Sequence, residues 1–383
     1  MNKIKNWAYR NLKGDPVIWF IVLILSLFSI LVVYSATGSL AYKMMDGNTE
    51  YYLFKHAILM VASLVTIWVV HRIDFRYYSK VSRLVLWLCV PLLLFTWMFG
   101  NNLNGATRTL TIPLINQSFQ TSDLASLALL VTLASMLSKR QKSIDDFQKA
   151  IVPMLFWIGL ICGLIALANF SSAILLFLTC MLVLFIGRVP MKYLAMLVVI
   201  CASFGSVAFM IGQRGGTAVS RVENFFSDET PYQAQQAYIA IASGGVIGKG
   251  PGQSDQRNFL PHPYSDFIYA IILEEYGLIG GVLILFLYLA LLYRGMKAAE
   301  GNDRAYGGLL SAGLSFALVI QAFVNMGVSV GLGPVTGLTL PFISMGGTSQ
   351  LFAGLALGII LSVSRGEIDR FGSTIGNQYK EAA

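Results

Sequence analysis

The chain has 383 residues, of which 56% are hydrophobic and only 12% are charged, and its mean hydropathy is +0.68. Because globular proteins carry roughly a quarter charged residues, this composition excludes a soluble globular enzyme, a coiled coil and a disordered chain. The net charge of +8 does not indicate nucleic-acid binding, because most of the basic residues fall in the segments expected on one side of the membrane. The four cysteines lie in apolar stretches without metal-ligand spacing, which indicates packing and not disulfides.

Ten apolar segments are candidates for membrane-spanning helices, which require about 20 apolar residues each. They lie at residues 17–36, 54–70, 84–100, 122–138, 151–168, 170–187, 192–212, 266–293, 308–330 and 345–363. The sequence therefore predicts an all-α polytopic membrane protein with about ten transmembrane helices, built as a single domain over residues 1–383.

The distribution of Lys and Arg predicts the orientation in the membrane. If segment 1–16 is cytoplasmic, the inner loops and tails carry 20 of the 27 basic residues, as the positive-inside rule requires. Both termini are then cytoplasmic, including the tail 364–383. The longest connection, residues 213–265, is then extracytoplasmic and lies between the seventh and eighth helices.

No inner loop is long enough to fold as a catalytic domain, and the sequence contains no P-loop, dinucleotide-binding GxGxxG or HExxH motif. Chemistry is therefore expected in the membrane or at its outer face. The loop 213–265 is the first candidate, because long loops in compact folds are usually functional or disordered. Within it, residues 232–242 have helix-like apolar spacing and are expected to lie along the membrane interface.

A glycine-rich stretch of this loop is a candidate anion site. Residues 243–252 contain five glycines and Lys249. Such a loop can present backbone N–H groups to an anion, and the alternative is an ordinary flexible loop.

Three acidic residues follow around the start of the eighth helix. Asp266 is either the helix N-cap, a position that favours Asp, or a general base at the membrane boundary. Glu274 and Glu275 lie further on in apolar sequence, where acidic residues are costly and mark function. On a straight helix the three cannot face one way. We therefore expect one Glu to anchor neighbouring helices and Asp266 to do the chemistry.

Two other outer connections carry polar signals. Arg108 lies among turn residues before Gln120 and Asp123, which open the fourth helix. Its guanidinium suits a phosphate ligand, or it extends toward the membrane interface. Residues 331–349 contain no charge but many Gly and Pro residues. This predicts irregular backbone lining a cavity, because such backbone is not tolerated against lipid.

These outer elements, in this order, resemble the SEDS family (shape, elongation, division and sporulation), the polytopic peptidoglycan polymerases, over about residues 15–365. The most specific likeness lies in Gln321–Asn325, Gly337–Ser344, Gly346–Ser349, Ile241–Gly250, Asp266–Ile268 and Glu274–Gly277. The resemblance implies that the chain polymerises lipid II, a disaccharide-pentapeptide on undecaprenyl pyrophosphate, in a bacterial plasma membrane.

The resemblance also implies site residues. Asp266 matches the family's essential aspartate and would remove the proton from the acceptor's 4-hydroxyl in an inverting transfer. Arg108 and Lys249 would neutralise the leaving pyrophosphate. A divalent metal, Mg²⁺ or Mn²⁺, would be the one cofactor to consider. The other candidate substrate-binding residues are Gln120, Asp123, Ser243, Gly244, Gly245, Glu275, Ser344, Gly346 and Gly347.

Within the family, Thr339–Pro341 favours a division member at the septum over an elongation member. The implied partners are a single-pass class B penicillin-binding protein transpeptidase and other division membrane proteins. Thr109, Ser126 and Asn169 depart from the family's Trp, Lys and Asp, which puts the fourth helix's contribution in question. The rival functions are a lipid II flippase or transporter, against which no inverted repeat is found, and a non-catalytic scaffold.

Overall fold

The structure is a computed structural model. It describes residues 11–38, 40, 49–103, 106–112, 117–211, 220–221, 223, 225–226 and 231–381.

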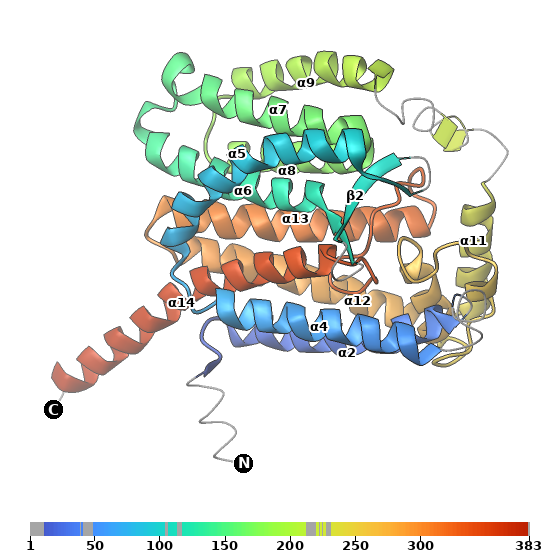
Figure 1. The fold of residues 1–383 in the computed structure, drawn as a ribbon. Coiled ribbons are helices and arrows are strands. Elements are labelled where there is room, and N and C mark those ends of the chain that lie inside the picture. Colours follow the sequence, from blue (N-terminus) through green and yellow to red (C-terminus); the bar gives the residue numbers. More distant parts are fainter. Residues whose placement is uncertain are drawn as a thin grey trace.

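Long helices make up most of the described chain (Figure 1). They are α2 (Pro16–Ala36), α4 (Thr49–Val70), α5 (Phe75–Phe99), α6 (Thr121–Arg140), α7 (Val152–Ala168), α8 (Phe170–Ile186), α9 (Met191–Ile211), α11 (Tyr232–Gly244), α12 (Ile268–Glu300), α13 (Ala305–Ser329) and α14 (Ser349–Glu381). Short helical turns lie at Gln141–Ser143, Phe147–Ile151 and Gln256–Asn258. Each of the ten predicted apolar segments falls on one long helix, and α11 is the predicted helix of the outer loop.

Seven of the described helices are long and apolar enough to cross a membrane by length and composition. Three further apolar stretches are shorter: Phe170–Ile186, Met191–Ser203 and Ser349–Arg365. The prediction of a helical, multi-pass membrane protein is therefore confirmed, whereas the count of ten spans stays a prediction.

A small antiparallel sheet between α5 and α6 departs from the all-α prediction. Its strands are β1 (Asn101–Leu103), β2 (Ala106–Ile112) and β3 (Gln117–Gln120), in the order β1-β2-β3. Thr109 pairs with Gln120, and Ile112 with Gln117. The sequence carried a signal for it, because Asn-Gly, which lies between β1 and β2, is the dipeptide most favoured in two-residue hairpins.

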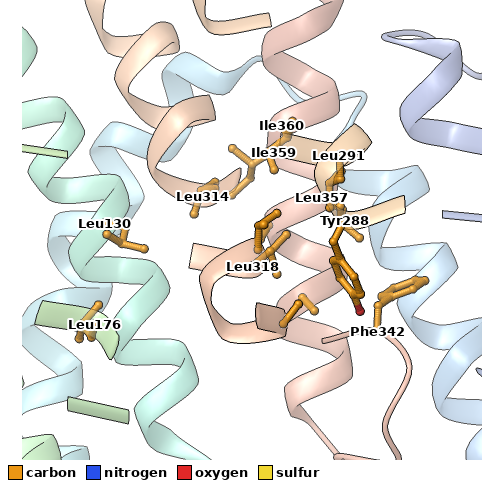
Figure 2. Packing of buried hydrophobic residues seen from close by; sticks show 14 of the residues in the cluster. Leu130, Leu176, Tyr288, Leu291, Leu314, Leu318, Phe342, Leu357, Ile359 and Ile360 are labelled. Carbon is orange, nitrogen blue, oxygen red and sulfur yellow. The ribbon is translucent and has the colours of Figure 1, made fainter. Parts of the chain in front are cut away.

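Helix α13 lies at the centre of the bundle, in contact with α6, α8, α12 and α14. Leu314 and Leu318 of α13 lie among buried side chains from these neighbours, including Leu130, Leu176 and Ile360 (Figure 2). By contrast, α2, α4 and α5 expose many large apolar side chains on their outer faces. An apolar exterior of this extent is the surface that lipid covers in a membrane protein.

The polar residues gather at the two ends of the bundle. At one end, Arg294 Nε donates to Asp15 Oδ2 over 2.6 Å, and Arg76, Lys139 and Arg304 line one shallow hollow. The other end carries the sheet, α11, the connection before α12 and the connection after α13 (Figure 1). This separation fits the predicted cytoplasmic and outer sides.

Helix α12 is broken at Gly277, whose φ of 64° and ψ of −168° are not helical. The glycine-rich loop before α12 pairs with the two sides of this break. The exchanged backbone bonds, donor first, are Lys249 N to Glu274 O (3.0 Å), Gly250 N to Glu275 O (2.9 Å), Leu278 N to Gly245 O (3.0 Å) and Ile279 N to Val246 O (3.3 Å). The loop thus satisfies backbone groups that the break would otherwise leave without partners.

Close approach of the two backbones explains the glycines. A Cβ on Gly248 would lie 2.3 Å from Glu275 O, and one on Gly277 would lie 2.4 Å from Gly248 N. We call residues 243–257, together with their contacts on α12, the loop anchor.

Gly248→Ala is expected to lower the thermal unfolding midpoint well below that of Gly252→Ala. Both glycines have positive φ, 90° and 78°, so both variants carry a similar backbone cost. Only Gly248 lacks room for a Cβ atom, because a Cβ on Gly252 would have no other atom within 4 Å. The difference in unfolding free energy should be on the order of 2 kcal/mol. Equal midpoints for the two purified variants would contradict the close packing of loop and helix.

Candidate active site

Asp266 lies in the turn before α12, and its side chain is not used as a helix cap. The N-cap position belongs to Phe267, which makes no side-chain capping bond. Among the described residues, Asp266 Oδ1 is buried and has no hydrogen-bond partner. The capping interpretation is therefore wrong, and the fold leaves a carboxylate oxygen free.

The backbone of this turn is held by α13. Asn325, which is 1% exposed, donates from Nδ2 to Asp266 O over 2.8 Å and to Leu338 O over 2.7 Å. A single amide group thus joins the start of α12 to the connection between α13 and α14. The Asn325 amide holds the backbone of Asp266 in position and does not bond to its carboxyl.

The connection between α13 and α14 holds the same turn from a second side. Ser344 Oγ donates to Ser265 O over 2.6 Å, and Met345 N donates to Tyr264 O over 2.9 Å. Ser344 Oγ also accepts from Leu340 N over 2.8 Å. The predicted site residue Ser344 therefore shapes the Asp266 turn from inside the protein.

The electrostatics of Asp266 reflect its burial. Burial raises the pKa of its carboxyl above the usual range, and its own backbone N–H, His262 and Arg221 oppose that rise. A carboxylate with a raised pKa is a stronger base than an ordinary Asp, provided that the pH is high enough to ionise it.

A cavity lies behind the connection, between α6, α8, α13 and α14. Residues 337–342, Ser344 and Gly346 line it together with side chains of those helices. The prediction that the Gly/Pro-rich segment has irregular backbone and lines a cavity is confirmed. Gly347, at φ 61°, faces the sheet instead: a Cβ there would lie 3.0 Å from Ser118 Oγ.

Gln120 and Asp123 meet in this cavity. Asp123 Oδ1 accepts from Gln120 Nε2 over 2.7 Å, and Oδ2 accepts from Ser349 Oγ over 2.6 Å. Ser126, where the resemblance implies Lys, donates back to Ser122 O over 2.7 Å. In this chain the acid of α6 is therefore satisfied by neutral donors.

Asn169, the third departure from the family pattern, also lines the cavity. It is the N-cap of α8, where its Oδ1 accepts from Ser172 N over 3.4 Å and its Nδ2 donates to Ser172 Oγ over 2.6 Å. The amide therefore starts a helix at the cavity wall.

The anion-site interpretation of the glycine-rich stretch is corrected by the structure. The N–H groups of Gly248, Lys249 and Gly250 donate to protein carbonyls, so they are not free to receive an anion. A Cβ on Gly244 would lie 2.0 Å from Leu273 O. The candidate residues Ser243, Gly244, Gly245 and Lys249 all belong to the loop anchor, because they pack or bond against α12.

Lys249 is ion-paired within the anchor. Its Nζ lies 2.7 Å from Glu274 Oε1 and 2.9 Å from Asp255 Oδ2, and these partners raise its pKa. Glu274 is fully buried and also accepts from Ser254 Oγ over 2.5 Å. The cation predicted for pyrophosphate is thus already neutralised by two carboxylates.

Glu275 is also part of the loop anchor, and its predicted role as a substrate ligand stays a prediction. It is 1% exposed, accepts a hydrogen bond from Ser35 Oγ of α2 and accepts another from Ser254 N over 3.3 Å. Arg257 Nη1 donates to the same Ser35 Oγ over 3.1 Å. Both glutamates therefore anchor the loop, where one was expected.

Arg108 and a metal remain predictions. The backbone of Arg108 lies in β2, but its side chain is outside the described part of the chain. Among the described residues, no three His, Cys, Asp or Glu side chains gather where they could hold a metal ion. Asp266 offers one free oxygen, so a divalent cation would take most of its ligands from substrate phosphate and water.

Two residues at the site were not singled out from the sequence. Asn325 stands in the sequence only as the end of the family-like segment Gln321–Asn325, and Arg221 as one of the seven basic residues outside the inner loops and tails. Asn325 could have been identified, because a polar side chain inside an apolar helix is a signal of function. No local sequence pattern indicates that Arg221 lies near the site.

Lys249→Met is expected to destabilise the protein. It leaves Glu274 buried without its cation, and breaking a buried pair costs about 3–5 kcal/mol, less here because Lys249 is partly exposed. The double variant Lys249→Met/Glu274→Gln should recover part of the loss, and Asp255→Asn, which removes only the exposed partner, should cost below about 1 kcal/mol. Thermal unfolding measures all three. A Lys249→Met protein of normal stability but weaker lipid II binding would restore the pyrophosphate interpretation.

Comparison with known proteins places the chain in a family. The family model for FtsW, RodA and SpoVE cell cycle proteins matches residues 15–368. The probable peptidoglycan glycosyltransferase FtsW of Geobacter metallireducens is 33% identical over 356 residues, covering 91% of this chain and 94% of the relative. The stage V sporulation protein E of Bacillus subtilis is 32% identical over 370 residues, covering 93% and 98%.

Two solved structures share the fold. The rod shape determining protein RodA of Thermus thermophilus is 24% identical, with a TM-score of 0.68 over 92% of this chain and 97% of its own. A chain of a peptidoglycan synthase complex, described for its structural coordination of polymerization and crosslinking, is also 24% identical, with a TM-score of 0.71 over 92% and 98%. From these matches and from the motifs around Asp266, the chain belongs to the FtsW/RodA/SpoVE family of cell cycle proteins.

Proposed function

We propose that this protein is a peptidoglycan glycosyltransferase that polymerises lipid II into glycan strands and releases undecaprenyl pyrophosphate. The observation that carries the proposal is Asp266: its backbone is held by Asn325, while its carboxyl has a buried oxygen without a partner among the described residues. A fixed, unused carboxylate is what general-base catalysis needs. The names of the relatives, several of them probable peptidoglycan glycosyltransferases, support the reaction.

In the proposed reaction Asp266 accepts the proton of the acceptor sugar's 4-hydroxyl. The oxygen then attacks the anomeric carbon of the donor from the face opposite the pyrophosphate. The bond between that carbon and the phosphate oxygen breaks, and the configuration inverts. Arg108 is the cation proposed to stabilise the leaving pyrophosphate, since Lys249 is engaged by Glu274 and Asp255.

The cavity lined by Gln120, Asp123 and Ser344 is proposed to receive part of the substrate. It adjoins the Asp266 turn through the connection 337–346, which lines the cavity and also bonds to Ser265 and Tyr264. The polar side chains of its wall, such as Gln120 and Asp123, are suited to sugar hydroxyls, while the undecaprenyl chain would lie against the apolar exterior in lipid.

The proposed setting is the division septum of a bacterial plasma membrane, beside a class B penicillin-binding protein transpeptidase and other division membrane proteins. The FtsW names among the relatives and a structural neighbour from a synthase complex support it. An elongation role like that of RodA is the alternative within the family. A flippase is the alternative outside it, and reconstitution with labelled lipid II distinguishes polymer from translocation alone.

Asp266→Asn is expected to yield a folded protein that binds lipid II and makes no detectable glycan. The amide cannot take up the proton, and general-base catalysis is worth about 10²–10⁴-fold. Folding should be unaffected, because the side chain caps nothing. Asp266→Glu should retain little activity, since misplacing a reacting group is heavily penalised.

The measurement is glycan polymerisation by matched amounts of each purified protein with its transpeptidase partner. Asp255→Asn makes the same change on the same loop and should leave polymerisation near the wild-type rate. Near-normal polymerisation by Asp266→Asn would show that another residue acts as the base, and the proposed mechanism would lose its main support.

The proposed topology is ten spans with both termini cytoplasmic. In a variant whose native cysteines are replaced, a cysteine at Gln253 or Asn224 should react with an impermeant maleimide added to intact spheroplasts, and one at Lys142 or Arg304 should not. Gln253, Lys142 and Arg304 are exposed, and Asn224 lies outside the described residues. Labelling at position 142 from outside would refute the span count.

A further inference from the structure

The hollow at the end of the bundle away from the Asp266 turn is lined by three cationic side chains. Arg76 of α5, Lys139 of α6 and Arg304 at the start of α13 line it, together with Tyr306 and the serines at positions 79, 135 and 138. No Asp or Glu within the described ranges lines it. Its volume of about 270 Å³ is far more than one water molecule needs. We call it the basic hollow.

Two of these cations lie where a helix disfavours positive charge. Arg76 is in the first turn of α5, and Arg304 is the N-cap of α13, which has no side-chain capping bond. The two helix starts are neighbours, because the ring centroids of Phe75 and Tyr306 lie 6.1 Å apart. A helix N-terminus carries a partial positive charge that favours an anion. Positive helix ends and positive side chains therefore meet in the basic hollow.

The protein offsets this charge only in part. Asp74 caps α5 and lies 3.5 Å from Arg76 Nε, in a pair of two partly exposed side chains. Asp303, the residue before Arg304, is exposed and does not line the hollow. Neither Lys139 nor Arg304 is in a salt bridge with any residue that the structure describes. The basic hollow thus has an excess of positive charge.

Tyr306 provides an independent observation. Its hydroxyl is buried and has no hydrogen-bond partner among the described residues, although its side chain lines the hollow. A buried hydroxyl is costly unless some partner completes it. A phosphate oxygen bound in the hollow could accept a hydrogen bond from this hydroxyl.

Membrane topology alone does not explain this arrangement. The positive-inside rule requires Lys and Arg in the inner loops, but it does not require them to converge on one hollow. It also does not account for a helix start without a cap or for a buried phenol without a partner. An anionic ligand in the hollow accounts for all three features.

We propose that the basic hollow binds the phosphate headgroup of an anionic phospholipid of the adjoining leaflet, which is the cytoplasmic one in the proposed topology. A lipid is favoured over a free phosphate because Tyr77, Val81 and Leu84, directly after Arg76 on α5, are exposed and share one helix face. They give the acyl chains an apolar surface that begins at the hollow. Basic sites between membrane helices suit such headgroups. The inference does not rest on the proposed glycosyltransferase reaction.

Native mass spectrometry of the purified full chain in detergent measures the binding, with phosphatidylglycerol or phosphatidylcholine of the same acyl chains added. The wild-type protein should bind phosphatidylglycerol more tightly than phosphatidylcholine. Arg76→Gln/Arg304→Gln should weaken phosphatidylglycerol binding about thirtyfold, because two cations are lost beside the headgroup. Phosphatidylcholine binding should be the same in both proteins.

The matched control is Lys142→Gln/Lys149→Gln. It removes the same net charge from the same end of the bundle, at exposed residues that do not line the hollow, and it should leave phosphatidylglycerol binding near that of the wild type. Equal weakening by the two double variants overturns the inference, because the basic face would then attract lipid without the hollow. Phosphatidylglycerol binding no tighter than phosphatidylcholine binding, or displacement of bound phosphatidylglycerol by inorganic phosphate, overturns the lipid assignment.

Tyr306→Phe tests the hollow without removing a charge. It keeps the ring against Phe75 and removes only the hydroxyl, so it should weaken phosphatidylglycerol binding about tenfold. Without lipid its thermal unfolding midpoint should be equal to or above that of the wild type, because a buried hydroxyl without a partner is removed. A lower midpoint with unchanged lipid binding would show a purely structural role and overturn the inference. This variant decides the question if Arg76→Gln/Arg304→Gln does not fold.

Discussion

The structure depends on one requirement of the bilayer: backbone polar groups that leave a helix must find partners in the protein. This chain meets the requirement at two places. The break of α12 at Gly277 is paired bond for bond with the glycine-rich loop. The irregular connection between α13 and α14 is held by Gln321, which donates to Thr339 O, and by Asn325, which donates to Leu338 O. Both solutions lie at the outer end, and the second one also bonds to the Asp266 turn through Asn325 and Ser344.

The hydrogen bonds that hold the Asp266 turn are made to its backbone and not to the Asp266 carboxyl. Asp266 is therefore fixed in position while one of its carboxyl oxygens stays available for a reaction. Its turn is hydrogen-bonded to Asn325 of α13 and to Ser344 of the connection between α13 and α14. These bonds limit the movement of the backbone that carries the Asp266 side chain. Reactivity depends steeply on such placement. The glutamates of α12 hold the loop: Glu274 accepts from Ser254 Oγ and pairs with Lys249, and Glu275 accepts from Ser35 Oγ. One oxygen of Glu275, Oε2, is also buried without a partner among the described residues.

The departures from the family pattern on α6 and at the start of α8 form a consistent local environment. Asp123 is satisfied by Gln120 and Ser349, both neutral, and Asn169 is satisfied by Ser172. An acid without a neighbouring base needs such donors, because burying a carboxylate is costly unless hydrogen bonds compensate. The part of the cavity wall formed by Gln120, Asp123 and Asn169 is therefore polar, although its charges differ from those that the resemblance implies.

The sequence alone determined the helical membrane class, the positions of the long helices and Asp266 as the candidate base, because apolar length and isolated acidic residues are local signals. It also predicted irregular, cavity-lining backbone at 331–349. Only the tertiary structure decided that Lys249 and Glu275 anchor a loop, that Asp266 caps nothing, and that Asn325 bonds the Asp266 turn to the connection between α13 and α14. These outcomes depend on contacts between residues far apart in the chain, and a single sequence carries no local pattern for such contacts.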